Sequence, residues 1–229
     1  MGMNFDLKKN MRLYYIPTTR AVRPRWLLEE IEIPYELVRV EMKMTQEQEY
    51  QELHPHGKVP ILVDGGITIY ESAAICTYLA DKYPDKGMSP RISEAERGYY
   101  YQWLFYATST LEPPVEHFMF EVIPSLPEKV IPRKVRSAIS KQEALEWFNR
   151  VAEPVRKSIV GNDFLVGNRF SVADIVIGGV LVWCSRLGML SESDPLSRYL
   201  NNLIERPAFS RADEDLYAKI APNVDLENN

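Results

Sequence analysis

Glu71 and Ser72 stand directly before the apolar run AAICTYL, and their side chains suit a small charged ligand. Serine is a preferred residue at the start of a helix, where free backbone N–H groups attract carboxylates. The carboxylate of Glu71 can pair with a positive group beside that start. The pair therefore predicts a site for a zwitterion, with Ser72 as the N-cap of a helix.

A second candidate segment is Lys58-Val59-Pro60, which leads into the apolar run ILV. Proline lowers the preference for the trans peptide, and a cis form persists in a folded protein where it is used. We therefore expect a fixed peptide between Val59 and Pro60 that can be cis. Val59 would then offer its backbone N–H and C=O groups to an extended partner.

The surrounding sequence predicts a small mixed sheet with helices. Short runs rich in β-branched and aromatic residues predict strands, and apolar positions at helical spacing predict helices. Asp64-Gly65-Gly66 is a tight hairpin signal. In chain order we expect a strand at 11–16, a helix at 21–31, a strand at 35–42 and a short helix at 45–53. Strands at 60–63 and 67–70 and a helix at 72–83 should follow. This β-α-β-α-β-β-α order predicts one four-stranded sheet.

Beyond this sheet the chain has helical spacing throughout. The segment PDKGMSPRI contains two prolines and a glycine, which predicts a linker. Pro113 and Pro114 should end or kink the first helix after it. Ser171 and Asp174 have the form of a capping box, for which we expect a structural role. The expected organisation is an arm at 1–10, a sheet domain at 11–84, a linker at 85–92, an all-helical domain at 93–220 and a tail at 221–229.

Composition and charge exclude several classes of function. The net charge of −5 and the lack of a basic cluster argue against nucleic acid as a partner. No apolar run is long enough to span a bilayer, and the first residues lack the apolar part of a signal peptide. Cys76 and Cys184 lie in apolar helical patterns, which suits reduced thiols in a cytoplasmic protein. His54, His56 and His117 lack the spacing of metal ligands, so we expect no metal.

Several motifs in order resemble the glutathione transferase superfamily over nearly the whole chain. They are HPHGKVPILVDG, YESAAICTYLADKY, the interdomain break, YQWLFYATSTLEPP and FSVADI. The resemblance implies a thioredoxin-like N-terminal domain with a βαβ-ββα sheet, followed by an all-α domain. It also implies glutathione as the co-substrate and a homodimer.

The resemblance further implies roles for five residues. In the family, the backbone beside a cis-proline pairs with the cysteinyl unit of glutathione, which gives this role to Val59 and the cis bond to Pro60. An acidic residue followed by serine holds the γ-glutamyl group, so Glu71 would pair with its ammonium and Ser72 with its carboxylate. Lys58 is a candidate for the glycyl carboxylate.

The residue that activates the thiol is open between two main candidates. A hydroxyl that donates a hydrogen bond to sulfur favours the thiolate. Thr19 stands two residues after Pro17, where many relatives carry serine, and its hydroxyl can donate this bond. Tyr15 is the alternative, since tyrosine-type relatives place their tyrosine at the end of the first strand; a strand aromatic packed under a helix is its competing role. Thr18, or backbone donors together with Arg20, remain further options.

No cysteine precedes Cys76, which departs from the cysteine-type relatives and argues against thiol transfer. The resemblance implies conjugation of the glutathione thiolate to a small hydrophobic electrophile, which is the activity we expect. Trp103 and Tyr106, on the aromatic helix after the linker, are the expected members of the electrophile's apolar pocket. The alternatives are a glutathione-dependent peroxidase, isomerase or thioether lyase, or a non-catalytic glutathione-binding protein.

Overall fold

The protein is represented by a computed structural model that describes residues 11–123 and 139–213. These residues form two compact units, 11–86 together with 205–213, and 87–204. The predicted arm at 1–10 and tail at 221–229 lie outside the described residues. Each unit is described by itself below.

The first unit contains a four-stranded mixed sheet. Its strands are β1 (Met11–Tyr15), β2 (Glu36–Arg39), β3 (Ile61–Asp64) and β4 (Ile67–Tyr70), in the spatial order β2-β1-β3-β4. β1 is parallel to β2 and antiparallel to β3, and β3 and β4 form an antiparallel hairpin. The predicted mixed sheet and its hairpin are confirmed.

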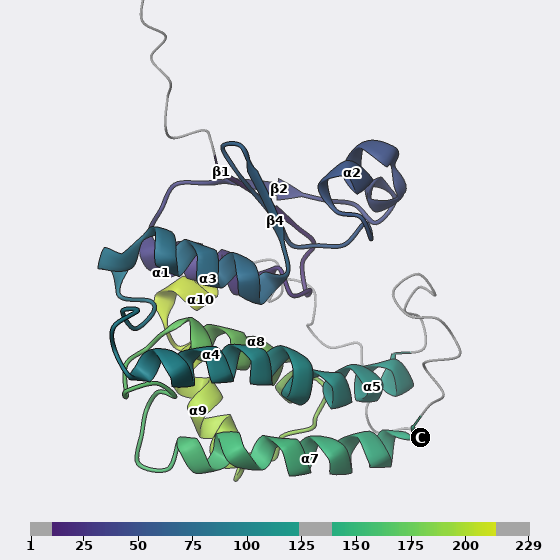
Figure 1. The fold of residues 1–229 in the computed structure, drawn as a ribbon. Coiled ribbons are helices and arrows are strands. Elements are labelled where there is room, and N and C mark those ends of the chain that lie inside the picture. The colour runs from purple at the N-terminus through teal and green to yellow at the C-terminus, as the bar shows by residue number, and fades with distance from the viewer. Residues whose placement is uncertain (1–10, 124–138, 214–229) are drawn as a thin grey trace, which may run out of the picture. The chain divides into compact units, whose positions relative to one another are not determined.

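The alternation of side chains along β1 separates the two faces of this sheet. Leu13 and Tyr15 are buried on one face, which α1 (Val22–Ile31) and α3 (Ser72–Lys82) cover (Figure 1). Tyr14 points to the opposite face and meets Tyr50 of α2 (Gln48–Leu53), with ring centroids 6.3 Å apart. Period-two alternation of this kind places neighbouring residues of the strand on opposite faces of the sheet. Short 3-10 turns precede α2, at Met44–Gln46, and follow α3, at Pro84–Lys86.

The short helix α10 (Pro207–Ala212) packs against α1 of the first unit, whereas the sequence predicted that its residues belong to the helical domain. The Trp26 and Phe209 rings meet edge to face with centroids 4.8 Å apart. The Arg206 guanidinium donates two hydrogen bonds to the Glu30 carboxylate, at 2.7 and 2.8 Å. A bidentate pair fixes orientation as well as distance, so α10 is held in register on α1.

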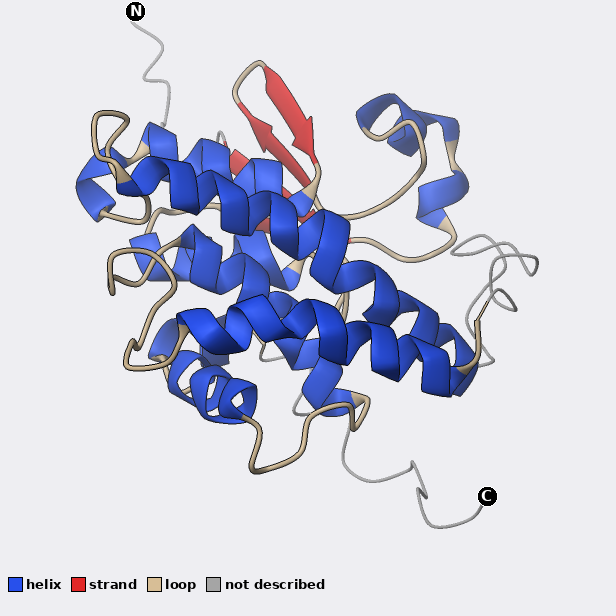
Figure 2. Cartoon of the chain, turned by 60° about the horizontal axis from the view of Figure 1, so that its bottom comes forward, coloured by secondary structure: helices blue, strands red, loops and turns tan. Residues whose placement is uncertain are grey.

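The second unit is helical, as the sequence predicted. Its elements are α4 (Glu96–Tyr106), a π-helical turn (Ala107–Leu111), α5 (Glu112–Val122), α7 (Lys141–Ser158), α8 (Val172–Arg186) and α9 (Pro195–Ile204). The strands drawn in red in Figure 2 all belong to the first unit. Within the described residues, no helix has the length and apolarity needed to cross a membrane.

The start of α8 is held by the predicted capping box. The Asp174 carboxylate accepts hydrogen bonds from the Ser171 backbone N–H at 2.9 Å and from the Ser171 hydroxyl at 3.1 Å. It also accepts from the Leu165 N–H at 2.9 Å and from the Tyr199 hydroxyl at 2.7 Å. Since Asp174 is fully buried, these donors replace the water that its charge would otherwise need.

The sequence predicted that Pro113 and Pro114 end or kink the first helix of this unit, and the structure shows an interruption just before them rather than an end of the helical path. The helical path continues from α4 through the π-turn into α5, and both prolines fall in the first turn of α5. Proline is tolerated there because the first N–H groups of a helix need no partner within it. The π-turn changes the backbone hydrogen-bonding pattern between α4 and α5, so α5 begins a new hydrogen-bonding register although the helical path is continuous.

Candidate functional site

Strand register brings three segments of the first unit to one end of the sheet. Ile61 pairs with Tyr14 of β1 on one side and with Tyr70 of β4 on the other. One residue further along each strand, Tyr15, Pro60 and Glu71 therefore approach the same end. The loop after β1, the segment before β3 and the junction of β4 with α3 meet there.

The segment before β3 has the backbone form that the sequence indicated. The peptide between Val59 and Pro60 is cis. Pro60 is buried and Val59 half-buried, while the Lys58 side chain is exposed. The Tyr50 hydroxyl donates a hydrogen bond to the Lys58 carbonyl at 2.9 Å. Tyr50 therefore anchors the segment from the face of the sheet that α2 covers.

At the junction of β4 with α3, Ser72 is not the N-cap that the sequence predicted. Glu71 is the N-cap, with φ 72° and ψ 111°, and Ser72 is the first residue of α3. The left-handed φ of Glu71 makes it the last non-helical residue, and its side chain is exposed. The buried Ser72 hydroxyl instead accepts a hydrogen bond from the Arg23 guanidinium at 3.2 Å.

The loop after β1 is held by the Thr19 hydroxyl. This hydroxyl donates to the Ile16 carbonyl at 2.6 Å and accepts from the Ala21 N–H at 3.3 Å. Thr18 is exposed with φ 67°, and Arg20 is half-buried. For Thr19 to donate to a ligand atom, its proton must turn away from the Ile16 carbonyl.

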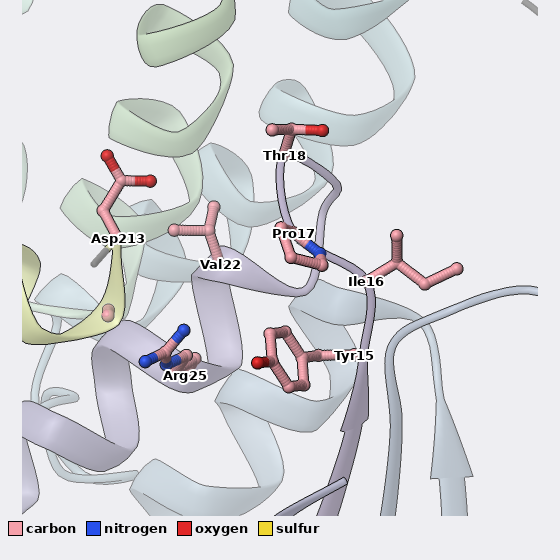
Figure 3. Close-up of a pocket in the computed structure, with 8 residues that line it drawn as sticks. Tyr15, Ile16, Pro17, Thr18, Val22, Arg25 and Asp213 are labelled. Carbon is pink, nitrogen blue, oxygen red and sulfur yellow. The ribbon is translucent and has the colours of Figure 1, made fainter. Parts of the chain in front are cut away.

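Tyr15 lies at the other side of this loop and is 7% exposed. The Arg25 guanidinium carbon is 5.3 Å from the centroid of its ring. Both residues line a small cavity together with Pro17, Thr18 and Asp213, among others. Figure 3 shows the phenol oxygen of Tyr15 pointing toward Arg25 across this cavity. The ring is packed beneath α1, which is the competing role that the sequence left open for it.

The predicted pocket residues of α4 have partners inside the helical unit. Trp103 is buried, and its ring meets the Tyr106 ring edge to face with centroids 5.6 Å apart. The Tyr106 hydroxyl donates to the Val151 carbonyl of α7 at 2.7 Å. The aromatic residues of α4 that face outward are Tyr99, Tyr101 and Phe105.

Arg23, Tyr50 and His54 contact the segments of the candidate site, although the sequence did not predict them as site residues. Arg23 is 1% exposed although charged, and it contacts Ser72. His54 is buried beside Tyr70, with ring centroids 4.7 Å apart. The position of His54 three residues before Gly57-Lys58-Val59-Pro60 is the one sequence signal that could have pointed to it.

Among the described residues, the two cysteines are poorly suited to react as thiolates, and no group of side chains is placed to bind a metal ion. Cys76 and Cys184 are free and fully buried. Burial raises the pKa of the Cys76 thiol to about 12 and raises that of Cys184 as well. Both thiols therefore stay protonated at neutral pH. Within residues 11–123 and 139–213, no three His, Cys, Asp or Glu residues are grouped to hold a metal ion.

Comparison with known proteins identifies the family. The glutathione S-transferase N-terminal domain model matches residues 9–81, and the C-terminal domain model matches residues 117–207. Glutathione S-transferase 3 of Schizosaccharomyces pombe is 29% identical over 168 residues, which are 71% of this chain and 69% of that protein. Disulfide-bond oxidoreductase YfcG of Escherichia coli strain K12 is 26% identical over 213 residues, 87% and 93% of the two chains.

A solved structure of a sphingomonad glutathione S-transferase complexed with glutathione has a TM-score of 0.72 and 25% sequence identity to this chain. The match covers 89% of this chain and 98% of that one. The two domain models match in the expected order and together span more than half of the chain. This protein therefore belongs to the glutathione transferase superfamily.

Proposed function

We propose that this protein binds glutathione at the end of the sheet where β1, β3 and β4 meet, and that it conjugates the glutathione thiolate to a small hydrophobic electrophile. In this proposal the cysteinyl unit pairs with the Val59 backbone beside the cis Pro60. The ammonium of the γ-glutamyl group pairs with Glu71, and its carboxylate with Ser72. Lys58 is assigned to the glycyl carboxylate.

One observation carries this proposal. The strand register aligns Tyr15, Pro60 and Glu71 at one end of the sheet, so an extended tripeptide can reach all three segments. Glu71 is exposed and acidic, whereas Ser72 has the buried Arg23 guanidinium at its hydroxyl. The charges are thus arranged for a zwitterion, with an anionic group beside the start of a helix. The family and its glutathione complex support the choice of ligand.

Thr19 is the residue that we propose to activate the thiol of glutathione. Its hydroxyl lies in the loop itself and can exchange the Ile16 carbonyl for a sulfur acceptor by rotating its proton. The Tyr15 ring is packed against Arg25 instead, so Tyr15 is the second choice. Arg20, half-buried in the same loop, is proposed as an additional glutathione contact.

The reaction follows from a thiolate held next to an electrophile. The sulfur attacks the electrophilic carbon, a carbon–sulfur bond forms, and the leaving group departs with the bonding electrons. The thiol proton goes to solvent. Proximity and a lowered thiol pKa together supply the rate. Trp103 and Tyr106 remain the proposed apolar contacts for the electrophile. We also propose that the protein is cytoplasmic and forms a homodimer. Light scattering tests the oligomeric state.

The decisive kinetic test compares variants on a generic aryl halide. We expect Thr19→Ala to lower kcat/KM by about 100-fold, since one hydrogen-bond donor to a developing anion is worth that much. Thr19→Ser keeps the hydroxyl and should keep most of the rate, and Tyr15→Phe should leave it near the wild-type value. If Thr19→Ala and Tyr15→Phe both retain full turnover, the activation scheme is wrong.

A glutathione-dependent oxidoreductase is the second candidate, because YfcG is a relative over most of the chain. The two cysteines of this chain are buried, so two glutathione molecules would have to supply both electrons. They would reduce a disulfide to two thiols and leave as glutathione disulfide. Hydroxyethyl disulfide as substrate tests this. Reduction of the disulfide without aryl halide conjugation would favour this second candidate.

A further inference from the structure

His54 ties together two segments of the proposed glutathione site. Its imidazole Nδ1 accepts a hydrogen bond from the His56 backbone N–H at 3.1 Å. Its carbonyl accepts from the Gly57 N–H at 2.8 Å. The two bonds close the turn that leads directly into Lys58-Val59-Pro60. His54 therefore sets the backbone path of the segment proposed to pair with the cysteinyl unit.

The His54 ring also reaches the other side of the site. It is 3% exposed and lies against the Tyr70 ring of β4, with centroids 4.7 Å apart and planes tilted by 38°. Tyr70 is the residue before Glu71. A single imidazole thus connects the segment before β3 with the junction that carries the proposed ammonium partner.

The hydrogen bond at Nδ1 is possible only for a neutral ring. A backbone N–H can only donate, so Nδ1 must carry a lone pair and the ring proton must be on Nε2. Protonation makes both ring nitrogens donors and places an N–H against the His56 N–H. The turn would then lose one of its two bonds.

We propose that neutral His54 is a positioning residue for glutathione, and that its protonation in mildly acidic solution releases the turn before Val59 and weakens glutathione binding. This inference rests on the proposed function. It adds a dependence on pH to the same site.

The charged and titratable groups around His54 set the direction of its pKa. Burial lowers this pKa most, and the neighbouring His56 and Lys58 lower it further. Glu71, across the site at the start of α3, raises it. The net effect is a lowered pKa, so the neutral form is favoured in the fold. The bonded turn is complete above histidine's ordinary pKa of about 6.5 and is lost as pH falls through the lower folded value.

An NMR titration of the ligand-free wild type tests the switch without glutathione. We expect the carbon-bound ring protons of His54 and the amide of His56 to titrate together, with a common midpoint below about 6.5. The His56→Gln variant keeps the backbone N–H but removes the imidazole that lowers the pKa of His54, so its midpoint should move upward while the His54 ring and the amide of residue 56 still titrate together. A His56 amide that does not shift while the His54 ring titrates would overturn the proposed switch.

Calorimetry with glutathione between about pH 5 and pH 7 tests the consequence, because histidine is the side chain that ordinarily titrates in this range. The carboxyl, amino and thiol groups of glutathione are of types that titrate below about 4 or above about 7.5. We expect the wild type to lose at least about fivefold in affinity on going to the acidic end. His56→Gln should also lose affinity on acidification, and the loss should begin at a higher pH than in the wild type because the imidazole that lowers the pKa of His54 is gone.

His54→Asn is the matched variant. An asparagine side-chain oxygen can accept from the N–H two residues on, as histidine Nδ1 does here, but it does not titrate. We expect it to bind glutathione like the wild type near pH 7 and to keep that affinity near pH 5. An unchanged wild-type affinity across the range, or an equal loss in His54→Asn, would overturn the role of His54. Absence of glutathione binding at every pH would instead refute the proposed function, and the NMR titration would still decide whether the switch exists.

Discussion

The Arg23 guanidinium donates a hydrogen bond to the Ser72 hydroxyl at 3.2 Å, which joins the first turn of α1 to the first residue of α3. We expect Ser72→Ala to weaken glutathione binding by about tenfold or more, since a hydrogen bond to a charged group is worth about 1.5–3 kcal/mol. Ser72→Thr keeps a hydroxyl and is the control. Calorimetry that finds equal affinity for Ser72→Ala and the wild type would remove Ser72 from the site.

Substitutions of Glu71 should change the affinity for glutathione without changing the stability of the fold. Its side chain is exposed, so Glu71→Gln should leave the thermal unfolding midpoint unchanged. The variant loses the charge proposed to pair with the ammonium, and we expect its affinity for glutathione to fall by about tenfold or more. Glu71→Gly, which suits the φ of 72°, should fold and bind as poorly. Full affinity in either variant would show that the ammonium binds elsewhere.

The buried capping box of α8 has an exposed counterpart at the start of α7, and the two allow a controlled test of burial. Asp174→Asn would turn an amide NH₂ toward groups that all donate, and we expect it to lower the free energy of unfolding by about 3 kcal/mol. In the exposed box the Glu143 carboxylate accepts from the Ser140 N–H at 2.8 Å. Glu143→Gln should cost much less. Equal losses in urea titrations would mean that burial of Asp174 is not the cause.

The sheet was predictable because strand alternation and a Gly-Gly hairpin are local signals. Tyr14 and Tyr15 fall on opposite faces, as period-two spacing requires. Local patterns did not predict the role of Ser72, because Glu71 is the N-cap of α3 and the Ser72 hydroxyl accepts a hydrogen bond from Arg23, which is distant in sequence. Long-range partners of this kind leave no local pattern.

The aromatic helix α4 was harder to interpret for a related reason. It carries aromatic side chains around much of its circumference, so spacing alone cannot assign them to the interior or the surface. In the structure Trp103 is buried and Tyr106 is half-buried with its hydroxyl bonded to α7, whereas Phe105 is 71% exposed. Similarly, α10 follows α9 in sequence, but Trp26 provides an apolar partner for it in the first unit.

The two cysteines allow a test of whether a thiolate of the protein itself can take part in the chemistry. Because burial raises the pKa of Cys76 to about 12 and that of Cys184 too, we expect neither to react with iodoacetamide in the native protein at neutral pH. Both should react fully in denaturant, as mass spectrometry would show. Labelling of native Cys76 would reopen a mechanism through a protein thiolate.

A crystal structure of the protein with bound glutathione tests the central claim most directly. We expect the cysteinyl backbone on Val59, the γ-glutamyl group at Glu71 and Ser72, and the sulfur within hydrogen-bonding distance of the Thr19 hydroxyl. That hydroxyl should have left the Ile16 carbonyl to which it now donates. Glutathione bound away from this end of the sheet, or a sulfur facing Tyr15 with Thr19 still bonded to Ile16, would contradict the account.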